Sequence, residues 1–430
     1  MRSMRTVLAM AIVLWIGAGA AHATTFLDTG FGTPRGGSTA RSLAMGSTGI
    51  SLRQGSDALI LNPAALVPGL QGLQLDLTGT LLHTSEDRLV PLYDSFDSYV
   101  DDAVVALNRN VYGNAEGGAV WRLPSEHPMA IGVGFFNRYE FAYDYFEEAR
   151  DPDSQSQPRD RIIEEREIAV EGSLWSVSAG YGAEIVPRVQ FGLAGHRYFG
   201  EPKRTVAIVN YDTDSRESDT VEQSLGGWGW SVGAWGRASE RIDLGVSFEG
   251  PFSVDGDYLH QQQTVTGTAD TTTTTALSRS IDYPGALRFG FTYHPRNRLN
   301  ANFAVEFERR FWESLDTPTA SVFGDSLRLR DTWDLRVGLE HVFYNDLPLR
   351  LGFRYLENYA DSESARSIYS VGMGYRLGRL GLDVTGMYAR QTSRQPFLFD
   401  PSYGAFPAPG SDQRVEDSVT QVVFAASYGF

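Results

Sequence analysis

Two arginines of this chain, Arg336 and Arg354, have side chains that could bind an anionic ligand. A guanidinium group is a planar fork of donors that holds a carboxylate through two parallel hydrogen bonds. We expect both arginines to point inward and to bind the head group of an anionic ligand. Alternatively, they form ion pairs across neighbouring strands. Their acidic partners would then be Glu306, Glu308 and Glu340.

The residue types needed for catalysis or metal binding are not arranged in recognisable patterns. The chain has no cysteine, so thiolate ligands and disulfides are excluded. Its seven histidines show no metal-ligand spacing, and no serine lies in a recognisable nucleophile sequence. We therefore predict no catalytic residue, no metal, no cofactor and no enzymatic activity. The net charge of −16 argues against a nucleic-acid partner.

The elements that carry the arginines show a two-residue alternation. In residues 349–355, apolar side chains alternate with arginine or glycine, and residues 333–340 repeat the alternation. Successive side chains of a strand point to opposite faces, so each segment has one apolar and one polar face. The alternation recurs in about fourteen segments. This is typical of an all-β protein, a transmembrane antiparallel β-barrel with a polar interior.

The connections between these segments alternate between short turns and longer stretches, as in barrels with periplasmic turns and external loops. We expect the longer stretches to be loops, among them 84–115, 146–166 and 253–274. Within 92–112, apolar residues recur at helical spacing: Val100, Val104, Leu107 and Val111. Residues 396–407 contain large apolar side chains, which either bind ligand or pack as a cap. These candidate ligand-binding residues are Phe397, Phe399, Tyr403 and Phe406.

Both ends of the chain predict export to the outer membrane. Residues 1–23 have the charged start, apolar centre and small-residue cleavage site of a secretory signal. The last strand ends on the aromatic Phe430, which resembles the signal read by the outer-membrane assembly machinery. We expect a multi-pass protein of the bacterial outer membrane, in contact with its lipid, whose barrel comprises residues 71–430.

Residues 24–70 do not follow the alternation and are rich in small residues. A barrel of about fourteen strands leaves an aqueous lumen unless something fills it, so we predict that this segment is a plug, or hatch. Pro63 fixes a turn, and Asn62 can bond neighbouring backbone. The pair would hold the corner of the hatch against the wall.

The hatch resembles that of FadL-type long-chain fatty acid transporters and their hydrocarbon-transporting relatives. The resemblance is carried by Ala44-Met45-Gly46, by the acidic Asp57 and by Asn62-Pro63-Ala64. It implies passive uptake of a hydrophobic small molecule, which leaves after the hatch shifts or sideways through the wall. One departure is the short loop between the fifth and sixth strands, where the family often has long helical loops.

A second interpretation is a barrel similar to the PorV family, which acts as a partner or shuttle in a protein-secretion system. Such barrels share the hatch-like start, so the hatch does not distinguish the two functions. The apolar residues of 92–112 and 396–407 would serve a ligand or a protein partner.

Overall fold

The computed structural model describes residues 25–52, 55–67, 72–94, 96, 98–151, 161–295, 300–315, 319–344, 346–399 and 412–430. The predicted signal sequence and the candidate residues Tyr403 and Phe406 lie outside the described residues. Within the described part, no helix is long and apolar enough to cross a membrane.

Over the described residues, fourteen antiparallel strands form a closed wall, which confirms the predicted fold class. The barrel closes where the first strand, β2, pairs with the last, β22, for example Leu75 with Tyr428. Closure leaves no free edge in lipid. The wall strands are β2 (Leu73–Tyr93), β3 (Tyr99–Leu123), β4 (Met129–Glu140), β7 (Ser173–Val186), β8 (Val189–Gly200), β10 (Ser215–Ser239), β11 (Ile242–Glu249), β14 (Ala286–Tyr293), β15 (Asn300–Arg310), β18 (Thr332–Val342), β19 (Pro348–Leu356), β20 (Arg366–Leu377), β21 (Leu380–Gln395) and β22 (Gln413–Gly429).

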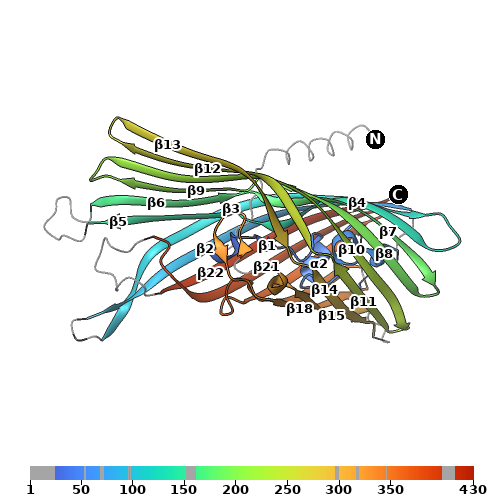
Figure 1. Ribbon diagram of the computed structural model, residues 1–430. Coiled ribbons are helices and arrows are strands. Elements are labelled where there is room, and N and C mark those ends of the chain that lie inside the picture. The colour runs from blue at the N-terminus through green and yellow to red at the C-terminus, as the bar shows by residue number, and fades with distance from the viewer. Residues whose placement is uncertain are drawn as a thin grey trace, which may run out of the picture.

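Five of the wall strands continue beyond a short interruption into a sheet that projects from one end of the barrel (Figure 1). Together with the long strand β10, the projecting strands pair in the order β5-β6-β9-β10-β12-β13. Their bounds are β5 (Tyr143–Arg150), β6 (Ile162–Glu171), β9 (Lys203–Asn210), β12 (Phe252–Thr266) and β13 (Ala269–Tyr283).

The predicted faces of the wall are confirmed. Leu339 and Leu351, which pair across β18 and β19, are both exposed on the outside. Arg336 and Arg354 are also paired in register, and both are buried inside. On these two strands the apolar side chains therefore point to lipid and the arginines to the lumen, as a membrane barrel requires.

The expected loops 84–115 and 253–274 are wrong, because most of their residues belong to long strands, and both ends of the expected loop 146–166 are also strands, β5 and β6. The helical spacing in 92–112 has a specific cause. Leu89 pairs with Val104 and Arg88 with Ala106, so Val105 is the extra residue of a β-bulge. A bulge shifts the alternation by one residue. Val104 and Val111 therefore lie on one exposed face although their spacing suggests a helix.

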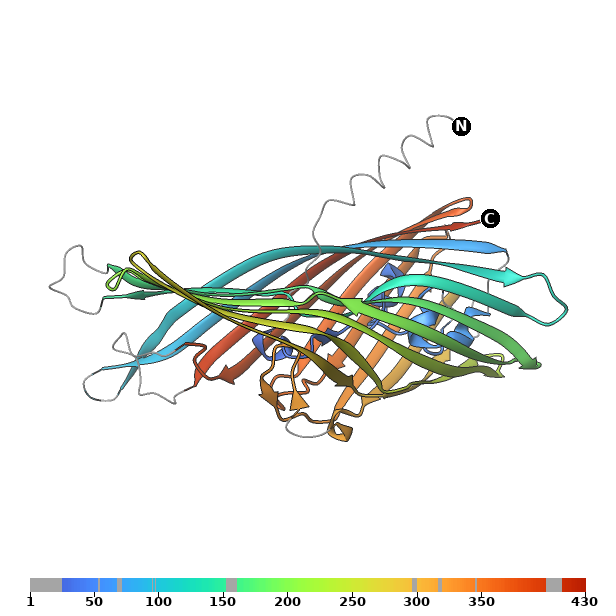
Figure 2. The same ribbon diagram turned by 45° about the horizontal axis from the view of Figure 1, so that its top comes forward.

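The N-terminal segment lies inside the wall and touches strands around the lumen (Figure 2). Its elements are η1 (Phe26–Asp28), β1 (Thr33–Pro34), α2 (Ala40–Ala44), α3 (Ala58–Leu61) and η2 (Pro63–Leu66). Towards the projecting sheet, the lumen is filled by an aromatic cluster. There Phe31 contacts Tyr283, Trp312 and Tyr359 at ring-centroid distances of 5.8, 5.4 and 6.0 Å. Trp312 belongs to the loop that carries η3 (Trp312–Ser314), β16 (Thr319–Ala320) and β17 (Ser326–Leu327).

Candidate functional site

The N-terminal segment rests on inward-facing glycines of the wall. A Cβ atom on Gly352 would lie 2.0 Å from the backbone nitrogen of Gly46, and one on Gly233 would lie 1.9 Å from Oδ1 of Asn62. Nothing larger than a hydrogen atom fits at either position. We call these positions the glycine seat. Its members, on nine strands and each in contact with residues 44–66, are Gly118, Gly132, Gly180, Gly182, Gly192, Gly233, Gly245, Gly338, Gly352 and Gly372.

Buried carboxylates anchor the same segment. Glu306 of β15 accepts hydrogen bonds from the backbone N–H groups of Gly49, Ile50 and Ser51, with N–O distances of 2.8, 2.8 and 3.0 Å. Arg41 donates Nε and Nη2 to Glu340, at 3.0 and 2.8 Å. The Glu340 charge raises the pKa of Arg41, which keeps this bidentate pair ionised.

The predicted hatch residues hold the segment together from within. Asp57 is fully buried and accepts hydrogen bonds from the backbone and hydroxyl groups of Ser38 and Thr39 and from the hydroxyl of Ser42. It therefore joins the start of α2 to the start of α3.

The Asn-Pro-Ala sequence forms the corner that was predicted from its residues. Asn62 donates Nδ2 to the carbonyl oxygens of Ile50 and Ala234, at 2.8 and 3.1 Å. Its Oδ1 accepts from the backbone N–H of Ala64 and caps η2, where Pro63 occupies the first turn. Asn62 thus links two turns of the segment to strand β10.

The two predicted head-group arginines differ in their surroundings. Arg336 is almost fully buried and donates to Asp334 and Glu308, with Nη2–O distances of 2.6 and 2.5 Å. Arg354 also binds Asp334, with an Nη2–Oδ2 distance of 2.8 Å, but it borders a cavity. The alternative ion-pair arrangement is thus present for both residues, with Asp334 as the partner that the sequence interpretation did not name.

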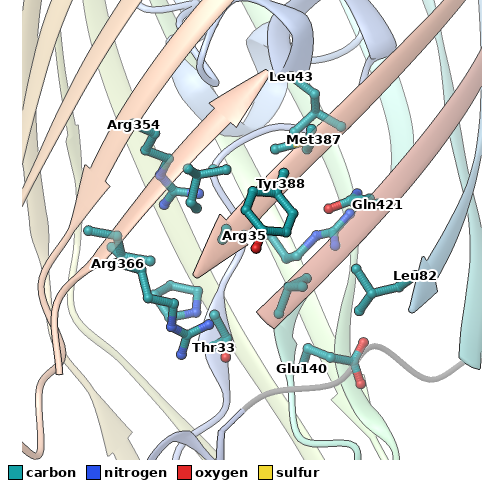
Figure 3. A pocket seen from close by; sticks show the side chains of 16 residues that line it. Thr33, Arg35, Leu43, Leu82, Glu140, Arg354, Arg366, Met387, Tyr388 and Gln421 are labelled. Carbon is teal, nitrogen blue, oxygen red and sulfur yellow. The ribbon is translucent and has the colours of Figure 1, made fainter. Parts of the chain in front are cut away.

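The cavity lies between the N-terminal segment and strands β2, β4 and β19–β22 (Figure 3). Its volume is about 90 Å³. For comparison, an engineered apolar cavity of about 150 Å³ binds benzene. Apolar side chains form part of the lining, whereas the polar part is rich in arginine. The lining includes Leu43, Leu82, Ile368 and Met387 on the apolar side, and Arg35, Arg354, Arg366, Glu140 and Gln421 on the polar side.

Most of the polar lining is already partnered. Arg366 contacts Asp28 and donates Nε to Gln391 at 3.1 Å, and Arg35 donates to Glu116 at 3.4 Å. Over the described residues, the Nε2 group of Gln421 is buried and has no hydrogen-bond partner. The cavity is therefore lined by three guanidinium groups, and one unsatisfied donor is buried in its wall, a lining that suits an oxygen acceptor.

The wall near this cavity has a seam. β3 pairs with β4 only through Gly117–Leu123 and Met129–Phe135. Beyond Phe135, β4 turns to the N-terminal segment and pairs with β1. Over the described residues, side chains rather than backbone bridge the rest of this seam: Asn110 donates to the Asp144 carbonyl at 3.0 Å, and Tyr112 donates to the Asp144 carboxylate at 2.7 Å.

The described part of the candidate loop folds onto the molecule. Phe399 stacks on Tyr145 at a centroid distance of 6.2 Å and lies 5.6 Å from the Arg166 guanidinium carbon. Phe397 is half-buried. This is the packed arrangement given above as the alternative to a free binding surface.

Sequence reasoning missed Arg35, Arg366 and Gln421 as residues of the cavity. A signal was present for the last two, because both lie on the inward parity of their strands. It also missed the glycine seat, although glycine recurs at inward positions such as Gly338 and Gly352. What was lacking was the position of the segment that these glycines contact.

Fold and interior together define a class: closed fourteen-stranded membrane barrels whose lumen is filled by the chain's own N-terminal segment. Within that class, the chain has the fold of the FadL-type channels, so the resemblance is confirmed at the level of the fold. Neither a protein-family model nor a curated protein sequence matches the chain.

Three solved structures illustrate the likeness. A FadL homologue from Pseudomonas aeruginosa superposes with a TM-score of 0.68 at 13% identity, covering 93% of this chain and 100% of its own. The toluene transporter TodX of P. putida gives 0.65 at 15% identity, covering 94% and 99%. The Ralstonia pickettii toluene transporter TbuX gives 0.60 at 15% identity, covering 95% and 100%. At such identities the likeness concerns the fold.

Proposed function

We propose that this chain is an outer-membrane channel for passive transport of hydrophobic small molecules, such as long-chain fatty acids or related hydrocarbons. The observation that carries the proposal is the cavity against the N-terminal segment, with apolar side chains and three arginines in its lining. An apolar ligand body gains about 25 cal/mol per Å² on leaving water. A carboxylate or carbonyl head would be held by Arg354 and Gln421.

The size of the cavity supports a gated path. A volume of about 90 Å³ holds only a few heavy atoms of a long ligand. Larger ligands enter only when the lining or residues 33–36 move. Since residues 44–66 are fixed on the glycine seat, residues 33–36 are the part that we expect to move.

The seam supports a sideways exit. Glu140, which lines the cavity, also pairs with Thr33 of β1 in the part of β4 that has left β3. Movement of β1 would release this end of β4 and open the seam towards the bilayer. The wall elsewhere is a continuous ladder of backbone bonds over the described strands.

Ligand binding to the purified protein tests the proposal. The change is Met387→Trp, which fills the cavity, and the matched control is Met373→Trp, since Met373 lies outside on the neighbouring strand β20. We expect Met387→Trp to weaken binding of a labelled fatty acid at least tenfold and the control to leave it unchanged. Equal effects of the two substitutions, or no binding of either fatty acid or hydrocarbon by the parent chain, would contradict the proposal.

A secretion role is not our proposal, because the described apolar residues that suggested it belong to a strand with a bulge and to a loop whose Phe399 packs on Tyr145. Native mass spectrometry of detergent-extracted protein separates the two functions. Co-purified lipid or hydrocarbon favours transport, whereas a stoichiometric protein partner without lipid favours secretion.

A further inference from the structure

Arg197 is a cation on the outer, lipid-directed face of the barrel. It lies on β8 between Gly195 and Phe199, which share its exposed face, near the end of the strand that leads to the projecting sheet. An arginine that faces lipid at the bilayer midplane costs about 2–4 kcal/mol, falling to about 0–1 kcal/mol near the interface. Its position therefore requires either an interfacial level or a partner.

Aromatic side chains place Arg197 at an interface. Its guanidinium carbon lies 5.3 Å from the ring centre of Trp228, an exposed residue of the paired strand β10. On the other side, Phe135 stacks on Trp175 at 4.5 Å and lies 6.0 Å from Phe199. Such bands of aromatic residues mark the level of lipid head groups.

The guanidinium group is held flat against the barrel. Nη1 of Arg197 donates to the Gly227 carbonyl oxygen at 3.0 Å, and a Cβ atom on Gly226 would lie 3.0 Å from Nη2. The missing side chain of Gly226 thus makes room for the group. An arginine fixed in this way loses little conformational entropy when it binds a ligand.

A second arginine shows what is unusual about this arrangement. Arg309 of β15 also faces outward over a tryptophan, with its guanidinium carbon 5.5 Å from the Trp333 ring, but its Nη2 lies 2.8 Å from the Asp331 carboxylate. Among the described residues, no acidic side chain forms an ion pair with Arg197.

We propose that Arg197, seated on Trp228 and Gly226, binds the phosphate of a lipid head group in the outer leaflet, lipid A being the phosphorylated lipid of that leaflet. Arginine matches phosphate oxygens bidentately. The inference rests on the membrane placement of the proposed function but not on transport, so loss of lipid A binding leaves the Met387→Trp result unaffected.

Native mass spectrometry of the full chain with bisphosphorylated lipid A tests the site. Arg197→Gln should weaken binding at least tenfold, and Gly226→Val should weaken it similarly because the charge stays but is displaced. Arg309→Gln is the matched control and should change binding less than twofold. Heat-dependent electrophoretic mobility verifies that each variant is folded.

Two further probes identify the source of the phosphate. Dephosphorylated lipid A should bind at least tenfold more weakly than lipid A, and millimolar inorganic phosphate should not displace lipid A. The proposal is overturned by full binding to Arg197→Gln, by an equal loss in Arg309→Gln, by tight binding of the dephosphorylated lipid, or by displacement with inorganic phosphate.

Discussion

Two parts of the N-terminal segment are held differently. Residues 44–66 lie on the glycine seat, and Glu306 and Asn62 bond their backbone to the wall. Residues 33–36 instead border a cavity, and their strand β1 consists of two residues paired with one edge of β4. The difference indicates a fixed part and a yielding part, since local opening follows the number of buried contacts that must be broken.

Deletion of residues 24–66 removes both parts and should have the largest effect. The barrel should remain folded, because the closed backbone ladder does not include the segment apart from β1. We expect a steady conductance in planar bilayers that the parent chain lacks. An unchanged conductance in a folded variant would show that the segment does not close the lumen.

The substitution Gly352→Val disturbs only the fixed part, residues 44–66. The new side chain would overlap the backbone of Gly46, which cannot move without leaving the wall. We expect unseating of residues 44–48 and intermittent conductance. Gly386→Val is the matched control on β21, because nothing lies within 4 Å of a Cβ atom there. Conductance in both variants, or in neither, would argue against the glycine seat.

Glu306→Ala removes the acceptor for three backbone N–H groups. Each buried donor left without a partner costs about 1–3 kcal/mol, so the local opening free energy should fall by about 3 kcal/mol or more. Hydrogen exchange of the Gly49, Ile50 and Ser51 amides should accelerate by at least a hundredfold, while amides of residues 58–61 serve as an internal reference. Unaltered exchange at 49–51 would show that Glu306 does not hold this turn.

Arg354→Ala probes the yielding part and should have the smallest effect. Arg354 borders the cavity and lies against Gly36, whereas Arg336 is enclosed by Asp334 and Glu308. We expect Arg354→Ala to weaken fatty-acid binding about tenfold, by about 1.4 kcal/mol, and to leave a hydrocarbon unaffected. Arg336→Ala should destabilise the barrel, a change visible as a lower unfolding temperature. Unaltered fatty-acid affinity in Arg354→Ala would leave both arginines with structural roles.

The sequence alone allowed the wall to be predicted because parity is a local property. Whether Arg336 points inward follows from Leu335 and Val337 beside it, and the structure agrees. The prediction failed where one extra residue interrupts the two-residue alternation of a strand. Val105 introduces a three-residue step, so the apolar residues of a strand showed helical spacing and the stretch was predicted to be a loop.

The candidate site was harder to predict because its partners are distant in sequence. Arg366 donates a hydrogen bond to Asp28, which is 338 residues away in the sequence, and Asn62 donates one to Ala234, which is 172 residues away. The periodicity of a strand does not show which residue of the N-terminal segment it contacts. The corner at Asn62 and Pro63 could be predicted, since its cap to Ala64 is a contact between near neighbours.

The row of wall glycines has a consequence for anyone who wishes to engineer an open pore from this scaffold. These positions carry no side chain, so removal of the N-terminal segment would leave main-chain atoms, rather than polar side chains, lining this part of the lumen. Polar residues would have to replace these glycines, for example Gly338 and Gly372. A design that removes the N-terminal segment must therefore also replace the wall glycines that it covers.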